Sequence, residues 1–176
     1  MGTKVTEALL SLWMLLSSAF PSVPAKPLQI PTLQVCNQMT QVRGKALVKI
    51  ASRSNGTHAG IFELSIQLRC RPRGYPEGKL QIDIDMSDST VSGILTGTTF
   101  GQLTSTGKRT PTAYLNGRCK AGKAPGCRFW LMVVDNSEGD KGTPDVIGFL
   151  VLNEAGNRVA YGTGPVAQGD ITVRAE

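Results

Sequence analysis

The feature that most constrains the fold is a two-residue alternation of apolar and polar side chains. It is clearest over residues 61–70, where every second residue from Phe62 is apolar and the residues between are polar or charged, and it recurs over residues 80–86. Successive side chains of a β-strand point to opposite faces, so this pattern is typical of strands with one buried face. Residues 71–78 carry two prolines and two glycines and predict a loop between these strands.

Other apolar and β-branched segments, separated by turn residues, predict further strands over residues 45–51, 90–99, 112–120, 127–135, 146–152, 158–161 and 171–174. The segment 127–135 is apolar on both faces, which is typical of a central strand covered on both sides. After residue 25 no segment shows an apolar stripe of helical period. About nine or ten short strands at this spacing predict an all-β fold, an antiparallel β-sandwich of jelly-roll type.

The first 25 residues differ in character from the rest of the chain. The apolar run over residues 8–20 is shorter than the roughly 20 residues that a membrane-spanning helix needs. Two prolines follow, and Ala25 ends a short segment with small residues where signal peptidase cleaves. We expect a signal peptide over residues 1–25, an extended lead-in over 26–34 and a single domain over 35–176. An uncleaved anchor is the alternative; no transmembrane segment is expected in the mature chain.

Four cysteines follow the expected cleavage site, and export would place them in an oxidising compartment, where disulfides persist. Of the three possible pairings we favour Cys36–Cys70 and Cys119–Cys127, because the second pair brackets a turn rich in glycine and lysine. Zinc is the alternative. The chain has no C-x-x-C pair and a single histidine, which disfavours it.

The last third of the chain contains a recognisable order of turns and strands. A strand that ends in Asp135-Asn136 is followed by a Gly/Pro/Asp loop, a hairpin around residues 153–157 and a short segment after Gly169. Residues 126–173 thereby resemble the closing strands of secreted bacterial β-sandwich domains of unknown function. The resemblance implies a sandwich fold and export, and it carries no activity and no functional residue.

The sequence predicts no catalytic residue. Hydrolase triads need a base beside a nucleophile, and the one histidine, His58, lies in a Gly-rich segment expected to be a solvated loop tip. Asp83 and Asp85 share a strand face and could serve glycosidic acid–base chemistry. They alternate with core residues as a solvent face does, and aromatic residues are only 6% of the chain, so a hydrolase is the disfavoured alternative.

The segment 135–145 gathers side-chain oxygens and is the one candidate for a cofactor, a calcium ion. Calcium binds six to eight oxygens, often from flexible acidic loops. A plain acidic turn is the simpler interpretation, since the spacing is not that of an EF-hand and Lys141 opposes a cation. The candidate ligands are Asp135, Asn136, Glu138, Asp140 and Asp145.

Positive charge is concentrated in the first half of the chain. The net charge is +6, and residues 26–81 hold nine basic and two acidic residues, whereas residues 82–176 hold nine and ten. A polyanion such as an envelope polysaccharide could bind there by charge. The candidate binding residues are Lys45, Lys49, Arg69, Arg71 and Arg73.

Two observations weigh against stronger claims for these charges. Stacking aromatic residues are absent from the segment apart from Tyr75, which disfavours nucleic acid as the partner. Lysines on edge strands also discourage aggregation, so a solvated edge is the simpler interpretation.

We therefore expect a basic, non-catalytic protein, secreted or periplasmic, that acts as a binding or structural module at the cell surface. A protein that binds polyanions through the basic segment 43–79 is the alternative. Asn55-Gly56-Thr57 is a glycosylation sequon, which has meaning only in a eukaryotic secretory route.

Overall fold

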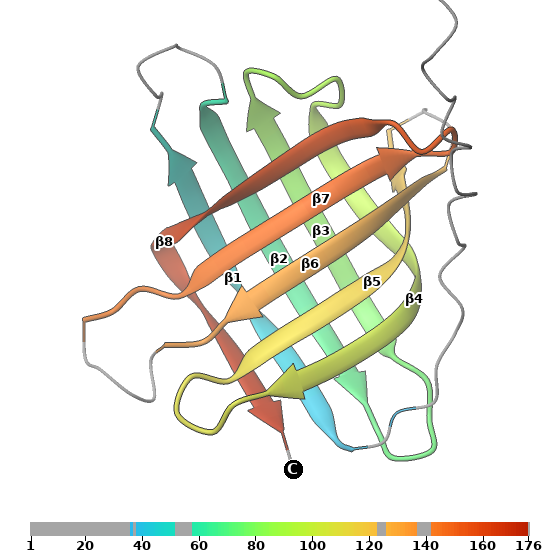
Figure 1. Ribbon diagram of the computed structural model, residues 1–176, viewed down its shortest axis with the longest axis vertical. Coiled ribbons are helices and arrows are strands. Elements are labelled where there is room, and N and C mark those ends of the chain that lie inside the picture. Colours follow the sequence, from blue (N-terminus) through green and yellow to red (C-terminus); the bar gives the residue numbers. More distant parts are fainter. Residues whose placement is uncertain (1–35, 37, 52–57, 123–125, 137–141, 176) are drawn as a thin grey trace, which may run out of the picture.

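The computed structural model describes residues 36, 38–51, 58–122, 126–136 and 142–175, and these form an eight-stranded antiparallel β-barrel (Figure 1). The strands are β1 (Thr40–Ile50), β2 (Gly60–Cys70), β3 (Glu77–Met86), β4 (Gly93–Thr106), β5 (Thr112–Ala121), β6 (Cys127–Val134), β7 (Val146–Asn153) and β8 (Arg158–Ala175). Each strand pairs with its neighbours in sequence, and β8 returns to pair with β1. None of the described residues belongs to a helix long and apolar enough to cross a membrane. The expected signal peptide and lead-in lie outside the described residues.

The closed barrel overturns the expected sandwich of nine or ten strands. Residues 158–161 and 171–174, expected as two strands, belong to one long strand, β8. Its first half pairs with β7, from Arg158 to Pro165, and its second half pairs with β1, from Val166 to Ala175. One strand therefore joins what a sandwich would keep as two separate sheet edges, and closure removes both edges.

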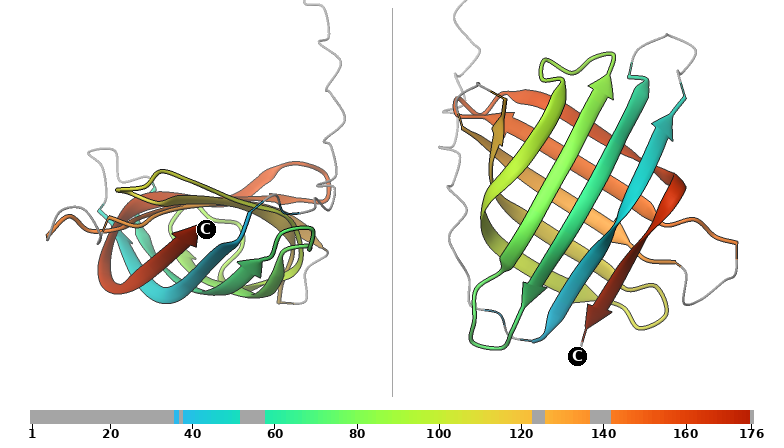
Figure 2. Two further views of the ribbon diagram at one scale, coloured as in Figure 1. Left: turned by 90° about the horizontal axis from the view of Figure 1, so that it is seen from below. Right: turned by 180° about the vertical axis from the view of Figure 1, so that it is seen from behind.

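The barrel is flattened, as the end-on view in Figure 2 shows. The strands β1–β3 form one broad wall, and β5–β7 form the other, which crosses in front of it in Figure 1 and behind it in the right view of Figure 2. β8 runs first with β7 and then with β1 at one side, and register shifts mark the bulges along its pairing. Bulges of this kind bend strands and tighten the corners of a barrel.

The alternating pattern fills the barrel interior with apolar side chains. Phe62 and Phe149 meet edge to face from opposite walls with ring centroids 4.7 Å apart, and both are almost fully buried. Aliphatic residues of all eight strands pack around them. Burying an aliphatic or aromatic side chain of this size contributes about 1.5–3 kcal/mol, so the filled interior is the main source of stability.

Both expected disulfides are confirmed. Cys36 is bonded to Cys70 at the end of β2, and Cys119 is bonded to Cys127. Cys119 and Cys127 are direct cross-strand partners in β5 and β6, with Cα atoms 4.8 Å apart. Disulfides persist in oxidising compartments, so the pairing indicates an extracellular or periplasmic protein.

Candidate functional site

The outer wall of β8, β1, β2 and β3 carries rows of aligned side chains, because the pairing register runs without a break through these strands near their ends. One row holds Arg174, Gln41, Arg69 and Glu77, the next holds Thr172, Arg43, Gln67 and Lys79, and a third holds Asp170, Lys45, Ser65 and Gln81. Five bases and two acids occupy these rows. We call Arg43, Lys45, Arg69, Lys79 and Arg174 the basic surface.

Only some of these charges are neutralised by a neighbour. Arg69 of β2 forms an ion pair with Glu77, its cross-strand partner on β3, with 2.7 Å between Nε and Oε1. Arg43 and Lys79 lie on either side of Gln67, two strand spacings or roughly 10 Å apart. Both are exposed, so they can contact an anionic ligand that lies across the wall.

Two open depressions lie in the same part of the wall. The larger, about 370 Å³, is lined by Gln41, Gln67, Leu68, Arg69, Glu77, Gly78 and Lys79. The second, about 340 Å³, shares Gln67, Gly78 and Lys79 with the first and continues towards β4. The first depression is lined mainly by charged and amide side chains and the second mainly by polar side chains and glycine, which suits a charged ligand better than an apolar one.

The loop between β2 and β3 places two of the predicted arginines beside the basic surface. Arg71 and Arg73 are exposed, and Arg73 has a positive φ of 64°. The backbone N–H of Arg73 donates to the carbonyl of Cys36, and the N–H of Cys36 donates to the carbonyl of Gly74. The Cys36–Cys70 disulfide fixes the same corner, so this loop is tied to the barrel on both sides.

Lys49 does not join the other predicted residues. It lies four residues from Lys45 along β1, which is roughly 13 Å in an extended strand. Its row contains Ile61 and Asp85, and the adjacent row contains Glu63 and Asp83. This part of the wall is therefore acidic. The wall of β1–β3 thus has a basic end, which holds the basic surface, and an acidic end, which holds Lys49.

Three residues of the basic surface are not among the binding residues that the sequence predicts. Arg43 shares the outward alternation of Lys45, and Lys79 directly precedes the alternating segment of β3, so the pattern of residues could have found both. Arg174 is far away in sequence and comes to β1 only because β8 closes the barrel.

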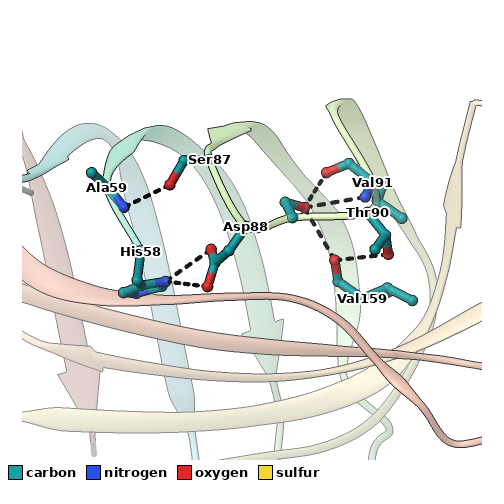
Figure 3. Close-up of polar contacts among 8 residues, drawn as sticks. His58, Ala59, Ser87, Asp88, Thr90, Val91 and Val159 are labelled. Carbon is teal, nitrogen blue, oxygen red and sulfur yellow. Dashed lines mark hydrogen bonds and ion pairs between the residues drawn. The ribbon is translucent and has the colours of Figure 1, made fainter. Parts of the chain in front are cut away.

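A second polar cluster lies at the opposite end of the barrel, where His58 precedes β2 (Figure 3). The His58 Nδ1 donates to both carboxylate oxygens of Asp88, at 3.0 and 3.1 Å. The imidazole ring stacks on Tyr161 of β8 with ring centroids 3.9 Å apart, and the guanidinium of Arg158 lies 4.2 Å from the centre of the same tyrosine ring. His58 is thus not the solvated loop residue that the sequence predicted, and only 17% of its side chain is exposed.

The electrostatics of this cluster favour an ionised Asp88. Partial desolvation raises the pKa of Asp88, but hydrogen bonds from His58 and Tyr161 and the charge of His58 outweigh it, so this pKa lies below its ordinary value. A histidine oriented by a carboxylate is two-thirds of a catalytic triad.

The serines of the neighbouring turn have other partners. Ser87 accepts a hydrogen bond from the N–H of Ala59, and Ser89 donates to the carbonyls of Val91 and Val159. The contacts of this cluster connect the start of β2, the turn after β3 and the start of β8, so we interpret the cluster as structural: it holds this end of the barrel together.

Three of the five predicted calcium ligands have side chains that are hydrogen-bonded to backbone groups. The Asp145 carboxylate accepts hydrogen bonds from the N–H groups of Asn136 and Ile171, at 2.9 and 3.0 Å, and the Asp135 carboxylate accepts one from Val173 at 2.8 Å. The Asn136 side chain donates to the carbonyl of Pro144. Within the described residues no group of three or more His, Cys, Asp or Glu side chains is placed to hold a metal. Glu138 and Asp140 lie outside the described residues, as does the sequon at Asn55, so these two predictions stay predictions.

Burial changes the titration of one of these carboxylates. Desolvation raises the pKa of Asp145 above its ordinary value, and the neighbouring charges of Asp135 and Asp170 act in the same direction. The hydrogen bonds from Asn136 and Ile171 oppose this shift without cancelling it. Asp83 and Asp85, the carboxylates weighed for glycosidic chemistry, are exposed on the outer wall of β3.

Comparisons with protein-family models, curated proteins and solved structures found no match to this chain. The candidate site therefore depends on the register and the charges of the chain itself.

Proposed function

We propose that the protein is an exported, non-catalytic β-barrel that binds an anionic polymer, such as an acidic polysaccharide of a cell envelope, through the basic surface. The observation that carries the proposal is the continuous register across β8, β1, β2 and β3. It gathers bases from residues 43, 45, 69, 79 and 174 on one wall.

The dimensions of the basic surface favour a polymer over a small anion. The three rows extend over four residues of strand and three strand spacings, roughly 14 Å in each direction. The depressions between the rows are open. A chain with repeated negative groups can contact several of these bases at once and release several bound counterions, whereas a single small anion contacts one or two.

The side chains of the wall also bear on the class of polymer. Single-stranded nucleic acids are held by stacking of bases on aromatic rings. The outward positions of β1, β2 and β3 hold no aromatic residue, and Tyr75 in the adjoining loop is 55% exposed. Binding by charge to a non-aromatic polymer such as a sulfated or carboxylated polysaccharide fits these side chains better than nucleic-acid binding.

The test is retention of the protein on immobilised heparin, used as a probe polyanion, in a gradient of salt. The variant Arg43→Gln, Lys45→Gln, Lys79→Gln removes three charges from the basic surface. The matched control, Lys108→Gln, Arg109→Gln, Arg118→Gln, removes three exposed charges outside the basic surface and leaves the same net charge.

We expect the first variant to elute at markedly lower salt than the unmodified protein, and the control to elute close to it, because affinity follows the charges that contact the polymer. Equal shifts for the two variants would mean that retention follows net charge alone. That result, or no retention of the unmodified protein, would reject the basic surface as a binding site.

A further inference from the structure

The outer wall formed by β6 and β7 is apolar, in contrast to the charged wall of β1–β3. Between the inward residues of these two strands, the outward positions hold mostly large apolar side chains. They are Trp130, Met132 and Val134 of β6 and Val146, Leu150 and Leu152 of β7, which we call the outer apolar face. The apolar pattern of residues 127–135 predicts a strand covered on both sides, but the barrel places one of these sides outside.

The register makes this face continuous. Trp130 lies opposite Leu150, and Val134 lies opposite Val146. Tyr114 of β5 lies beside Met132 and is 47% exposed, and Tyr161 of β8 lies beside Leu150. All six residues of the face are partly exposed, and no described strand packs outside the barrel against them.

A continuous, partly exposed apolar face on neighbouring strands is typical of an interaction site, because soluble monomers rarely leave large apolar patches open to water. We propose that its partner is a second copy of this chain, packed wall to wall. The proposal does not depend on the proposed function, since the basic surface lies on the opposite wall of the flattened barrel (Figure 2).

The area of this wall, compared with the area that a stable interface buries, favours a second barrel as the partner. The outer apolar face lies on two strands, and with the flanking β5 and first half of β8 the wall has four. Four strands at about 4.8 Å spacing and eight residues at about 3.4 Å give a projected area of roughly 500 Å² before side-chain relief is counted. A stable interface takes about 800 Å² of accessible surface from each partner. The whole wall must therefore be covered, which another flat wall does and a short peptide does not.

The face is also flat. Gly148 lies between Met132 and Thr163 in one row, and a Cβ there would be 2.9 Å from the Thr163 Oγ1 and 3.6 Å from the Met132 Cε. The two neighbouring side chains therefore close over the glycine and leave no hollow for a small ligand. Trp, Tyr and Met are enriched in the centres of protein interfaces.

The positive charge along one end of this wall favours one orientation of the second copy. Arg118, Arg128 and Arg158 lie along one end row of the wall, and β5, β6, β7 and residues 158–165 contain no acidic residue. A two-fold axis that runs across the strands places this row against the uncharged row of Thr112, Val134, Val146 and Pro165 of the other copy. Such an isologous contact buries the apolar centres together and keeps the arginines of the two copies apart.

Sedimentation equilibrium of the purified protein between about 1 and about 100 µM tests the proposal, since this range covers ordinary dimer affinities. The variant Met132→Lys, Leu150→Lys places two charges in the centre of the outer apolar face. The matched control, Leu47→Lys, Ile94→Lys, adds the same charge on the other wall, where both residues share one outward row.

We expect a dimer for the unmodified protein and for the control, and a Kd at least about thirty-fold higher for the Met132→Lys, Leu150→Lys variant. Circular dichroism and the absence of free thiols show whether each variant is folded. A monomer at every concentration overturns the proposal, whether or not the protein binds phospholipid vesicles. So does a dimer that survives the Met132→Lys, Leu150→Lys change and is lost in the control.

A second measurement needs no variant. Trp130 is the only tryptophan after residue 25, so its emission in the exported chain reports on this face alone. We expect the emission maximum to shift to shorter wavelength as the concentration rises through the Kd. Emission that stays constant while the mass doubles would place the interface elsewhere and overturn the proposal.

Discussion

The Asp145 carboxylate accepts a hydrogen bond from the backbone N–H of Ile171, 26 residues further along the chain, at 3.0 Å. Asp135 does the same for Val173 at 2.8 Å. At this corner β8 has left β7 and pairs only with β1, so one side of its backbone has no neighbouring strand. The two carboxylates take the place of that strand and satisfy N–H groups that burial would otherwise leave unpaired.

We expect Asp145→Asn to destabilise the fold by about 1–3 kcal/mol, because an amide offers one acceptor oxygen where the carboxylate accepts from both Asn136 and Ile171. Urea unfolding at pH 3.8, before the contribution of Asp145 begins to fall, measures the loss. An unchanged midpoint would mean that these bonds contribute nothing to stability.

The pH dependence of that loss has a definite sign. The pKa of Asp145 is raised in the folded state, so its contribution to stability is fully present below the ordinary value of 3.8 and is lost as the pH rises through the folded pKa. We therefore expect the difference in unfolding free energy between the unmodified protein and Asp145→Asn to shrink as the pH rises from 3.8. A difference that grows would contradict the raised pKa.

The contribution of Asp88 to stability is expected to change with pH in the opposite direction. Desolvation raises the pKa of Asp88, but the interactions with His58 and Tyr161 together lower it further, so its contribution is present above pH 3.8 and is lost as the pH falls through the folded pKa. We expect Asp88→Asn to be less stable than the unmodified protein at pH 5, and the difference to vanish in strong acid. Thermal unfolding across this range measures it, and a difference that persists in acid would contradict the ion pair with His58.

The two disulfides should differ in their effect on stability. They close loops with sequence separations of 34 and 8 residues. In the chain-entropy account these loops correspond to about 3.8 and about 2.6 kcal/mol. We expect Cys36→Ser, Cys70→Ser to lower the unfolding free energy by about 1 kcal/mol more than Cys119→Ser, Cys127→Ser. The reverse order in urea unfolding would show that the short cross-strand bond has a larger role than its loop length predicts.

Gly162 tests the packing of the interior. A Cβ at this position would be 2.9 Å from the Phe149 Cε1 and 3.1 Å from the Phe62 Cε1, the two rings that meet across the barrel. We expect Gly162→Ala to cost about 1–3 kcal/mol by overpacking. The control is Gly126→Ala, where the nearest atom belongs to the flexible Glu154 side chain. Equal melting temperatures for the two variants would contradict the close packing.

Lys45 and Lys49 form a matched pair for the basic surface. They are the same residue on the same face of β1, but Lys45 lies next to the row that holds Arg43 and Lys79, whereas Lys49 lies in a row with Asp85. We expect Lys45→Gln to reduce the salt dependence of heparin binding by about one charge, and Lys49→Gln to leave it unchanged. Equal effects would show that position on the wall is irrelevant.

The sequence by itself determined the strands. Period-two alternation over residues 61–70 and 80–86 reflects the pleat of a strand, a local property, and β2 and β3 formed there. The pairing of Cys119 with Cys127 also followed from local spacing, because these two residues border one hairpin.

Only the tertiary structure decided how the strands close. The alternation in residues 158–175 is the same whether they form two strands of a sandwich or one strand of a barrel, since the choice depends on pairing with residues more than a hundred positions away. Closure then brought Arg174 to the basic surface and turned the apolar side of β6 outward, whereas the register of β1, β2 and β3 placed Lys49 near acidic residues. Long-range register sets these positions, and no local pattern of residues encodes it.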